Sequence, residues 1–421
     1  MIPLQRIREE ADAIRQGARR KRMSAPVDEI LELDERARSL RTEVETLRAE
    51  HNAAGRAITG RPTDEQRAAM GARKQLIQSD EADLAELEGR RDALLLEVPN
   101  PPYPEVPDGA GAEDSVSVRE WGEVPAFDGF DPLPHWEVGE RLGIFDFERA
   151  GKMSGSRFSV VYGAGARLQR ALVSFFLDRA VAAGYTEVAP PFLVRRASMI
   201  GTGQLPKFED DAFKVDDDLF LIPTAEVPVT NLYREEIIEP GRLPILHCAW
   251  TPCFRREAGA AGRDTRGYIR LHQFEKVEMV KFVEPETSRD ELEAMVLDAE
   301  SLLQALGLRY RVLLLCAGDM GFTQAKTYDL EVWAPGLGRW LEVSSLTDFG
   351  EFQARRADIR YRPSAQERPR HPHTLNGSGL ALPRVVAGIL ETFQQADSSV
   401  VVPAVLLPYM AGIERLTPPA R

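Results

Sequence analysis

The segment Phe254–Glu278, with the sequence FRREAGAAGRDTRGYIRLHQFEKVE, is the most informative stretch of the chain and contains five arginines. On either side of its centre, charged residues recur at every second position, which is the periodicity of a β-strand. The centre is a glycine-rich stretch, Ala258–Gly267, that contains Arg263, Asp264 and Arg266. The pattern predicts two strands joined by a mobile loop.

The two predicted strands place complementary chemical groups on one surface. Arg255 and Glu257 point the same way on the first strand, and Arg270, Phe274 and Glu278 line up on the second. A guanidinium, an aromatic ring and a carboxylate suit a phosphate, a purine ring and an ammonium group, respectively. The surface is therefore predicted to bind an aminoacyl-adenylate.

Length and charge limit the class of protein. A chain of 421 residues has room for about three typical domains, although two unequal domains fit its composition better. The net charge of −13 argues against a protein that coats nucleic acid, but an acidic body can still carry a local basic groove. The clearest basic run, Arg19–Arg22, suits a solvated helix face and an RNA contact equally well.

Cysteine usage and hydropathy predict a cytoplasmic protein without a membrane partner. Cys248, Cys253 and Cys316 are too few and too irregularly spaced for a disulfide framework or a zinc site. The amino terminus has acidic residues and lacks the apolar core of a secretion signal. The longest apolar run, Val400–Ile413, is interrupted by prolines and is shorter than the ~20 residues that a bilayer requires.

The first hundred residues are predicted to form an antiparallel helical hairpin, over about residues 28–98. Apolar residues recur at heptad spacing in two series: Leu33, Ala37, Leu40, Val44 and Leu47, then Met70, Ile77, Leu84, Leu87 and Leu94. Gly60-Arg61-Pro62 interrupts the pattern, and Thr63 with Gln66 has the spacing of a capping box that starts the second helix. Periodicity alone favours a dimerisation coiled coil or a stalk over an RNA-binding arm.

A proline-rich linker between Pro99 and Pro107 predicts a domain boundary, with one domain at 1–103 and another at 104–421. Beyond it, strand-like runs at 219–225, 277–283, 327–334 and 339–345 alternate with helical stretches at 166–183 and 289–306. Strands with polar groups on one face indicate an antiparallel sheet, so the predicted fold class is α+β.

Three segments, in order, resemble the motifs of the class II aminoacyl-tRNA synthetases. Gly184–Leu193 is similar to motif one, Phe254–Glu278 to motif two, and Gly377–Arg384, with the sequence GSGLALPR, to motif three. The sequence HQFEKVE at 272–278 and the triplet Thr224-Ala225-Glu226 resemble the corresponding segments of seryl-tRNA synthetases of the bacterial type. With the hairpin, the resemblance covers nearly the whole chain.

The resemblance implies an activity and a set of partners. It implies a class II antiparallel-sheet domain that uses ATP and Mg²⁺ to convert L-serine to seryl-adenylate. The seryl group would then pass to the terminal adenosine of tRNA(Ser), and the family would also permit tRNA(Sec). It implies that the amino-terminal hairpin binds the tRNA and that motif one forms the interface of a homodimer.

The resemblance also implies roles for single residues in ATP binding. Arg255 would bridge the serine carboxylate and the α-phosphate, and Arg384 would hold the γ-phosphate, which makes them the candidate catalytic residues. Phe274 would stack on adenine and Glu257 would accept a bond from its exocyclic amine. The further ATP-binding candidates are Arg256, Arg270, Glu342, Val343, Ser344 and Ser345, and Glu342 and Ser345 would also hold Mg²⁺. Taken singly, each arginine would be a surface charge and Phe274 a core residue.

Serine selection needs buried polar groups, because only unmatched hydrogen bonds reject alanine strongly. The candidates are Thr224, Ala225, Glu226, Arg255, Glu278 and Ser378. The sequence leaves open which of Glu226 and Glu278 meets the ammonium and which the hydroxyl. Glu226 as a surface strand residue, and Ser378 as a turn residue, are the structural alternatives.

Some local features depart from this picture or stand outside it. Leu346, Thr347 and Asp348 follow the Glu342–Ser345 segment where the resemblance predicts small residues and asparagine. His371 and His373 lack a third ligand for a metal site, and His272 is expected to supply a supporting hydrogen bond.

Two other functions compete with a seryl-tRNA synthetase. A carrier-protein ligase resembles the catalytic domain but lacks the hairpin, and a silent RNA-binding paralogue would not need Arg255, Glu278, Glu342 and Arg384.

Overall fold

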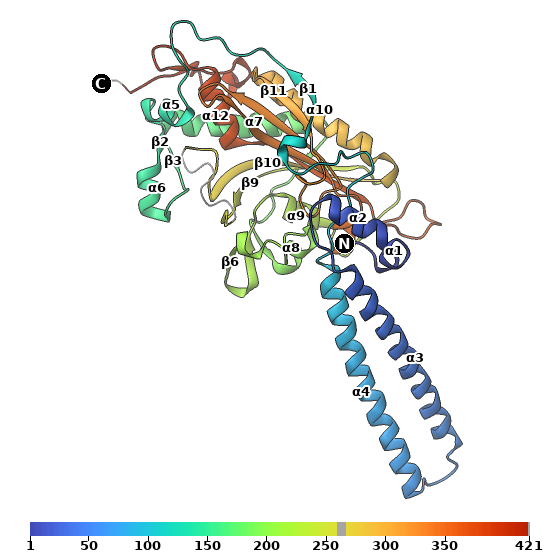
Figure 1. Ribbon diagram of the computed structural model, residues 1–421. Helices are drawn as coiled ribbons and strands as arrows, with labels where there is room; N and C mark the ends of the chain where they lie inside the picture. Colours follow the sequence, from blue (N-terminus) through green and yellow to red (C-terminus); the bar gives the residue numbers. More distant parts are fainter. Residues whose placement is uncertain (259–266, 420–421) are drawn as a thin grey trace. The chain divides into compact units, whose positions relative to one another are not determined.

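The computed structural model describes residues 1–258 and 267–419, which form two compact units, Met1–Pro99 and Asn100–Arg421 (Figure 1). The first unit consists of the helices α1 (Leu4–Glu9), α2 (Ala11–Arg20), α3 (Val27–Ala57) and α4 (Asp64–Leu95). Helix α3 has 31 residues and is therefore ~45 Å long at the standard rise of about 1.5 Å per residue. The predicted helical hairpin is confirmed.

Local sequence sets the start of α4. Thr63 Oγ1 accepts the N–H of Gln66 at 3.1 Å, and Gln66 Oε1 accepts the N–H of Thr63 at 2.9 Å, which is the predicted capping box. The first series of heptad residues lies mostly inside the hairpin, where Leu33, Ala37 and Val44 are buried.

Ion pairs fix the register of the hairpin. Arg48 Nε donates to Glu81 at 2.8 Å between α3 and α4. At the base, the buried carboxylate of Asp34 accepts two bonds from Arg8, at 2.6 and 2.7 Å, and one from Arg38 at 3.1 Å. Burial alone would raise the pKa of Asp34, but the hydrogen bond from Arg8 and the charges of Arg8 and Arg38 lower it.

The second unit is built on an eight-stranded sheet in the order β1-β11-β12-β13-β15-β10-β9-β4. Its strands are β1 (Val116–Trp121), β4 (Thr186–Glu187), β9 (Ile245–Phe254), β10 (Gln273–Val283), β11 (Tyr310–Leu314), β12 (Lys326–Ala334), β13 (Arg339–Asp348) and β15 (His373–Ala381). Neighbours pair antiparallel except at the edge, where β4 runs parallel to β9. The predicted antiparallel sheet is confirmed, with one parallel strand added.

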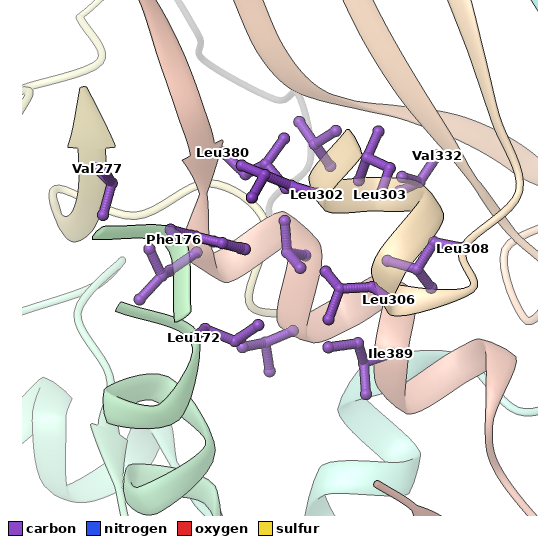
Figure 2. Close-up of a cluster of buried hydrophobic side chains, with 14 of the residues drawn as sticks. Leu172, Phe176, Val277, Leu302, Leu303, Leu306, Leu308, Val332, Leu380 and Ile389 are labelled. Carbon is purple, nitrogen blue, oxygen red and sulfur yellow. The ribbon is translucent and has the colours of Figure 1, made fainter. Parts of the chain in front are cut away.

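Three helices pack on one face of this sheet: α7 (Gly163–Ala182), α10 (Ser288–Leu306) and α12 (Leu382–Thr392). Leu172 and Phe176 of α7, Leu303 of α10 and Ile389 of α12 share a buried cluster with Val277 of β10 (Figure 2). Because successive strand residues point to opposite faces, even-numbered residues of β10 such as Val280 and Phe282 face away from this core and belong to another cluster.

Shorter elements surround the sheet. The helices are α5 (His135–Arg141), α6 (Phe147–Ser154), α8 (Arg196–Thr202), α9 (Glu226–Thr230) and α11 (Phe352–Arg356). The minor strands are β2 (Phe145–Asp146), β3 (Val160–Val161), β5 (Leu193–Arg195), β6 (Phe213–Val215), β7 (Leu219–Leu221), β8 (Ile237–Ile238), β14 (Arg360–Tyr361), β16 (Val400–Val401) and β17 (Arg415–Leu416). Short 3-10 turns complete the chain at Ala112–Asp114, Glu209–Asp211, Asp216–Asp218, Asn231–Tyr233, Pro285–Thr287 and Ala404–Tyr409. Within the described ranges, every helix is too short or too polar to pass through a bilayer.

Candidate active site

The first strand of the 254–278 segment is shorter than predicted. Strand β9 ends at Phe254, so Arg255 and Glu257 lie beyond it. Glu257 has φ +52°, a left-handed conformation that does not fit a strand. The N–H of Arg255 still donates to the carbonyl oxygen of His272 at 2.9 Å, whereas the N–H of Arg256 donates to that of Asp211 at 2.9 Å, in another segment.

The second strand also begins later than predicted, because β10 starts at Gln273, after Arg270 and His272. The N–H of His272 donates to the carbonyl oxygen of Arg157 at 2.9 Å, so this N–H is not available to the sheet. Arg270 nevertheless forms an ion pair with Glu257, so the two predicted nucleotide-binding residues are adjacent. Arg263, Asp264 and Arg266 lie outside the described residues.

Within β10, Lys276 and Glu278 share the face of the sheet that is turned away from the helical core. Phe274 has the same position in the alternation, and its ring also packs against the helical core. Glu278 is 2% exposed and pairs in register with Ser378 of β15. Its carboxylate accepts a bond from Thr224 Oγ1 at 3.0 Å and forms an ion pair with Lys276. Sequence analysis missed Lys276, although its even-numbered position on β10 was a usable signal.

Glu226 begins α9 and is buried beside this carboxylate. Burial, followed by the charge of Glu278, raises the pKa of Glu226 to about 7. Thr224 Oγ1, which donates to Glu278, also accepts the N–H of Glu226 at 3.3 Å. The structure thus brings two predicted serine-binding carboxylates close together, and Ala225, between Thr224 and Glu226 in sequence, is fully buried. The alternative of a surface strand residue is wrong for Glu226.

Arg255 lies between this pocket and the aromatic ring of Phe274. Its Nε donates to the carbonyl oxygen of Pro223 at 3.2 Å, and its guanidinium carbon is 5.2 Å from the Phe274 ring centroid. The His272 ring bonds through Nδ1 to the carbonyl oxygen of Arg255 at 2.9 Å, which is a supporting hydrogen bond of the expected kind. The Arg256 guanidinium turns instead toward the ring of Phe213, 6.0 Å away.

Arg384, near the start of α12, connects two predicted ATP-binding segments. Its Nη1 donates to the carbonyl oxygen of Glu342 at 2.7 Å and lies 3.2 Å from Glu342 Oε1. Its Nε donates to the carbonyl oxygen of Ile269 at 3.3 Å. Arg384 therefore links β13 to the part of the motif-two segment that precedes β10.

A β-bulge places Glu342 and Ser345 on the same face of β13. Residues three apart on a regular strand point to opposite faces. Here Asp329 and Glu331, two residues apart on β12, pair with Ser345 and Glu342, three residues apart on β13. The extra residue near Val343 restores a common face, a feature that the sequence did not reveal.

The oxygen atoms on this face have the right chemistry for a hard cation. The carboxylate of Glu342 and the hydroxyl of Ser345 are the ligand types that Mg²⁺ prefers. Asp329 opposite them was missed by sequence analysis; burial, followed by the charge of Glu342, raises its pKa well above the ordinary value. Among the described residues, no group of three or more His, Cys, Asp or Glu side chains is arranged to hold a metal ion. A bound Mg²⁺ would therefore need phosphate oxygens as further ligands.

The remaining residues of this strand serve the core or the neighbouring strand. Val343 is fully buried, and Ser344 Oγ donates to the carbonyl oxygen of Ser378 at 2.6 Å. Leu346 packs on Gly377, where a Cβ would approach Leu346 Cγ to 2.7 Å.

Thr347 and Asp348, the other two residues that depart from the resemblance, have hydrogen-bond partners nearby. Thr347 Oγ1 lies 3.0 Å from Thr327 Oγ1 of β12, and Asp348 accepts the N–H of Gly350 at 2.7 Å. The structure thus accommodates all three unexpected residues.

The predicted motif-one and histidine features are also located. Tyr185 is buried and donates to Asp298 at 3.0 Å, whereas Phe192 and Leu193 are exposed. His371 Nδ1 bonds to the carbonyl oxygen of Ile359 at 2.8 Å, and His373 Nδ1 to the hydroxyl of Ser288 at 2.8 Å.

The chain matches two family models. Residues 1–102 match the seryl-tRNA synthetase N-terminal domain, and residues 207–393 match the tRNA synthetase class II core domain (G, H, P, S and T). A serine–tRNA ligase of Thermomicrobium roseum is 56% identical over 99% of this chain and 95% of its own length. A serine–tRNA ligase of Desulfitobacterium hafniense is 52% identical over 98% of this chain and 99% of its own.

Solved structures agree with the sequence relatives. The seryl-tRNA synthetase of Pyrococcus horikoshii, complexed with ATP, is similar over 100% of both chains with a TM-score of 0.93 and 37% identity. The cytoplasmic serine–tRNA ligase of Naegleria fowleri, in complex with AMP, gives a TM-score of 0.88 at 27% identity over 100% of this chain and 99% of its own. The chain therefore belongs to the seryl-tRNA synthetase family.

Proposed function

We propose that this protein activates L-serine with ATP to form seryl-adenylate and pyrophosphate, and then transfers the seryl group to the terminal adenosine of tRNA(Ser). The observation that carries the proposal is the buried pair of carboxylates, Glu226 and Glu278, with Thr224 bonded to the Glu278 carboxylate and to the backbone N–H of Glu226. Full-length similarity to serine–tRNA ligases supports it.

Activation needs positioning and charge stabilisation rather than an enzyme nucleophile. The serine carboxylate attacks the α-phosphate, and pyrophosphate leaves. Arg255 donates to both anions and stabilises the charge that develops between them. Arg384 holds the γ-phosphate, and its bonds to Glu342 and Ile269 orient its guanidinium for that task.

The rest of the nucleotide is bound by the motif-two segment and β13. Phe274 stacks on adenine, while the ion pair of Glu257 and Arg270 lies at the edge of the same segment. Glu342 and Ser345 would hold a Mg²⁺ that accompanies ATP, and such an ion would neutralise phosphate charge. Arg256 and the backbone of the Val343–Ser344 segment complete the ATP site.

Serine is selected by polar groups that only a hydroxyl and an ammonium can satisfy together. Glu278 and Glu226 supply two buried carboxylates, Thr224 a hydroxyl, and Ser378 a further hydroxyl on the adjacent strand. Alanine would leave one of these groups without a hydrogen bond, which costs about 1–3 kcal/mol.

The hairpin of α3 and α4 is the tRNA-binding arm of the proposed enzyme. Its surface carries arginines on both helices, including Arg41 and Arg48 on α3 and Arg90 on α4, which suit contacts to RNA phosphates. This assigns residues 1–103 to tRNA binding and residues 104–421 to catalysis.

We infer that the enzyme is a homodimer and acts in a reducing, cytoplasmic environment. The exposed Phe192 and Leu193, in the segment similar to motif one, form an apolar surface suited to a second copy. Cys248, Cys253 and Cys316 are all free thiols, as expected under reducing conditions.

The deciding experiment is pyrophosphate exchange with each amino acid in turn, followed by charging of tRNA. Exchange that depends on serine, with charging of tRNA(Ser), supports the proposal. Exchange with glycine or alanine in preference to serine would refute the specificity. Serine activation with transfer to a carrier protein, and none to tRNA, would identify a carrier-protein ligase instead. A protein that binds tRNA but activates no amino acid would be a silent paralogue.

A further inference from the structure

Gln353 is a fully buried residue of α11 that contacts the proposed serine site from behind. Its Nε2 lies 2.6 Å from Glu226 Oε1 and 3.3 Å from the carbonyl oxygen of Thr202. Its Oε1 accepts a bond from Thr374 Oγ1 at 2.8 Å. Both N–H groups and the oxygen of this amide are therefore in use.

These partners fix the orientation of the Gln353 amide. The carbonyl oxygen of Thr202 can only accept a hydrogen bond, so the nitrogen of the amide must face it. The same nitrogen faces Glu226, which means that Gln353 can only donate to this carboxylate. A donor at 2.6 Å stabilises the ionised form of a carboxylate relative to the neutral form.

Gln353 also joins three elements around the pocket. Thr202 ends α8, Glu226 begins α9, and Thr374 lies in β15, the strand that carries Ser378. The amide thus ties the position of Glu226 to the backbone of α8 and to the strand beside Glu278. Substitution of Gln353 would release the carboxylate from both anchors.

The charged groups that face Glu226 come from β10. Glu278 repels it and Lys276 attracts it. From β15 it meets only the neutral side chain of Asn376, among the interactions that shift its pKa.

The nearby arginines are engaged elsewhere. Arg356 of α11 donates to the carbonyl oxygens of Ile200 and Leu205, and Arg255 donates to that of Pro223. Arg196 of α8 pairs with Asp218 and Glu209 on the surface. The hydrogen bond from Gln353, like that from Asn376, therefore comes from an uncharged side chain and favours the ionised form of Glu226.

We propose that Gln353 is a positioning residue for serine recognition, because it holds the Glu226 carboxylate charged and oriented toward the substrate through anchors at Thr202 and Thr374. This inference rests on the proposed function, in which Glu226 contacts serine. It predicts that Gln353 affects the use of serine selectively, although it lies behind the carboxylate that meets the substrate.

The test compares Gln353→Met with a matched control, Gln394→Met, in the full-length protein. Gln394 is also buried and also makes three hydrogen bonds: it accepts the N–H of Leu133 at 2.8 Å and donates to the carbonyl oxygens of Leu133 and Glu391, each at 2.9 Å. Both variants lose the same functional group from a buried site. Pyrophosphate exchange is measured between pH 6 and 9 with serine and ATP varied separately, beside a melting curve.

For Gln353→Met we expect the KM for serine to rise about tenfold or more, with the KM for ATP within about twofold of wild type. The acid limb of the pH profile of kcat/KM for serine should move to higher pH, because the ionised carboxylate has lost a donor. Gln394→Met should lower the melting temperature and leave the serine KM and the acid limb in place. Unchanged serine KM and acid limb in Gln353→Met, with lost stability alone, would overturn the inference.

A second variant covers the case in which Gln353→Met does not fold. Gln353→Glu keeps the shape and places a carboxyl group against Glu226, so the two groups share a proton and the acid limb should rise by about one pH unit or more. An acid limb identical to that of wild type would overturn the inference. If the wild-type protein itself shows no exchange with serine, the proposed function fails; exchange by wild type with unaltered variants refutes the role of Gln353 alone.

Discussion

Arg255 combines three local features that a single arginine in the sequence does not reveal. It follows the last residue of β9, it donates to the carbonyl oxygen of Pro223, and its guanidinium lies against the Phe274 ring. These contacts hold the guanidinium between the proposed adenine and serine positions. An arginine that is oriented before substrate binds loses less side-chain entropy in the reaction.

Arg255→Ala should therefore abolish adenylate formation without unfolding the protein. Loss of a charge-assisted contact to the reacting phosphate lowers turnover by about 10²–10³-fold or more. Pyrophosphate exchange beside a melting curve measures both effects. The control is Arg289→Ala, which removes an arginine that pairs with Glu105 and lies over Tyr103. Exchange by Arg255→Ala within about threefold of wild type would show that the residue is peripheral.

The raised pKa of Glu226, about 7 instead of 4.5, leads to a second prediction about a single residue. The folded state binds a proton there that the unfolded state has released, so Glu226 contributes stability below about pH 4.5 that is lost as pH rises through about 7. Glu226→Gln removes this dependence. The melting temperature of this variant, relative to that of wild type, should rise between pH 5 and pH 8. Its serine-dependent pyrophosphate exchange should fall.

The melting temperature of each protein is measured across this pH range. The difference between the two proteins isolates the effect of Glu226 from that of the other titrating groups. A difference that stays constant with pH would show that the carboxylate is ionised throughout. A cooperative melting transition in both proteins shows that the variant is folded well enough to compare.

At the scale of elements, a buried histidine anchors the segment that leads into β10. His135, at the start of α5, is fully buried, and its Nε2 accepts the N–H of Tyr268 at 3.1 Å. Because Nε2 accepts, Nδ1 carries the hydrogen that bonds to Glu391 Oε1 of α12 at 2.7 Å. Gly267 beside it has φ +90°, and a Cβ there would approach His135 Nε2 to 2.5 Å. Three separate elements thus meet at one side chain.

His135→Leu should destabilise the protein and weaken ATP binding more than serine binding. It leaves the N–H of Tyr268 without its partner, at a cost of about 1–3 kcal/mol for a buried group. The carboxylate of Glu391 loses the ring N–H but keeps the backbone N–H groups of position 135 and of Leu337. Since Arg384 bonds to the carbonyl oxygen of Ile269, next to Tyr268, displacement of this segment reaches the phosphate site.

Thermal melting and separate KM values for ATP and serine check this prediction. His371→Leu is the matched control, because its ring makes one bond to a backbone carbonyl oxygen in a partly exposed position. If both variants melt alike and keep the wild-type KM for ATP, α5 does not position the nucleotide site.

At the scale of the whole molecule, the two compact units predict that activation and tRNA charging can be separated. The hairpin can be shortened within its regular part: Arg41 pairs with Glu88, so residues 45–84 can be replaced by a short glycine-rich turn that retains this pair. The buried Asp34 with Arg8 and Arg38 keeps the base of the hairpin intact. We expect serine-dependent pyrophosphate exchange near the wild-type rate.

Transfer of serine to tRNA should fall by orders of magnitude in this shortened protein, because the phosphate and shape contacts of the arm position the acceptor end. Charging of tRNA(Ser) at subsaturating concentration, with exchange as the internal control, measures the effect. If the shortened protein folds and charges tRNA at a rate near that of wild type, the arm is a stalk or a partner-binding coiled coil and does not bind tRNA.

Local sequence was sufficient for the features that depend on short-range chemistry. The heptad series and the capping box at Thr63 specified the hairpin, because a helix is defined by residues three and four positions apart. Period-two alternation located β10, β12 and β13 and selected Phe274 and Glu278 for one face. The family was recognisable for the same reason, since its motifs are contiguous in the chain.

The features that depend on contacts between distant parts of the sequence were decided only by the tertiary structure. The ends of β9 and β10 were wrong in prediction. The N–H of Arg255 still bonds to His272, but the N–H groups of Arg256 and His272 bond to the carbonyl oxygens of Asp211 and Arg157, which lie far away in sequence. The common face of Glu342 and Ser345 depends on a bulge that is defined by the partner strand β12. Gln353 contacts Glu226 from 127 positions away, and nothing in its local sequence distinguishes it from other glutamines. A hydrogen bond has no sequence signature when its two partners are brought together only by the packing of separate elements.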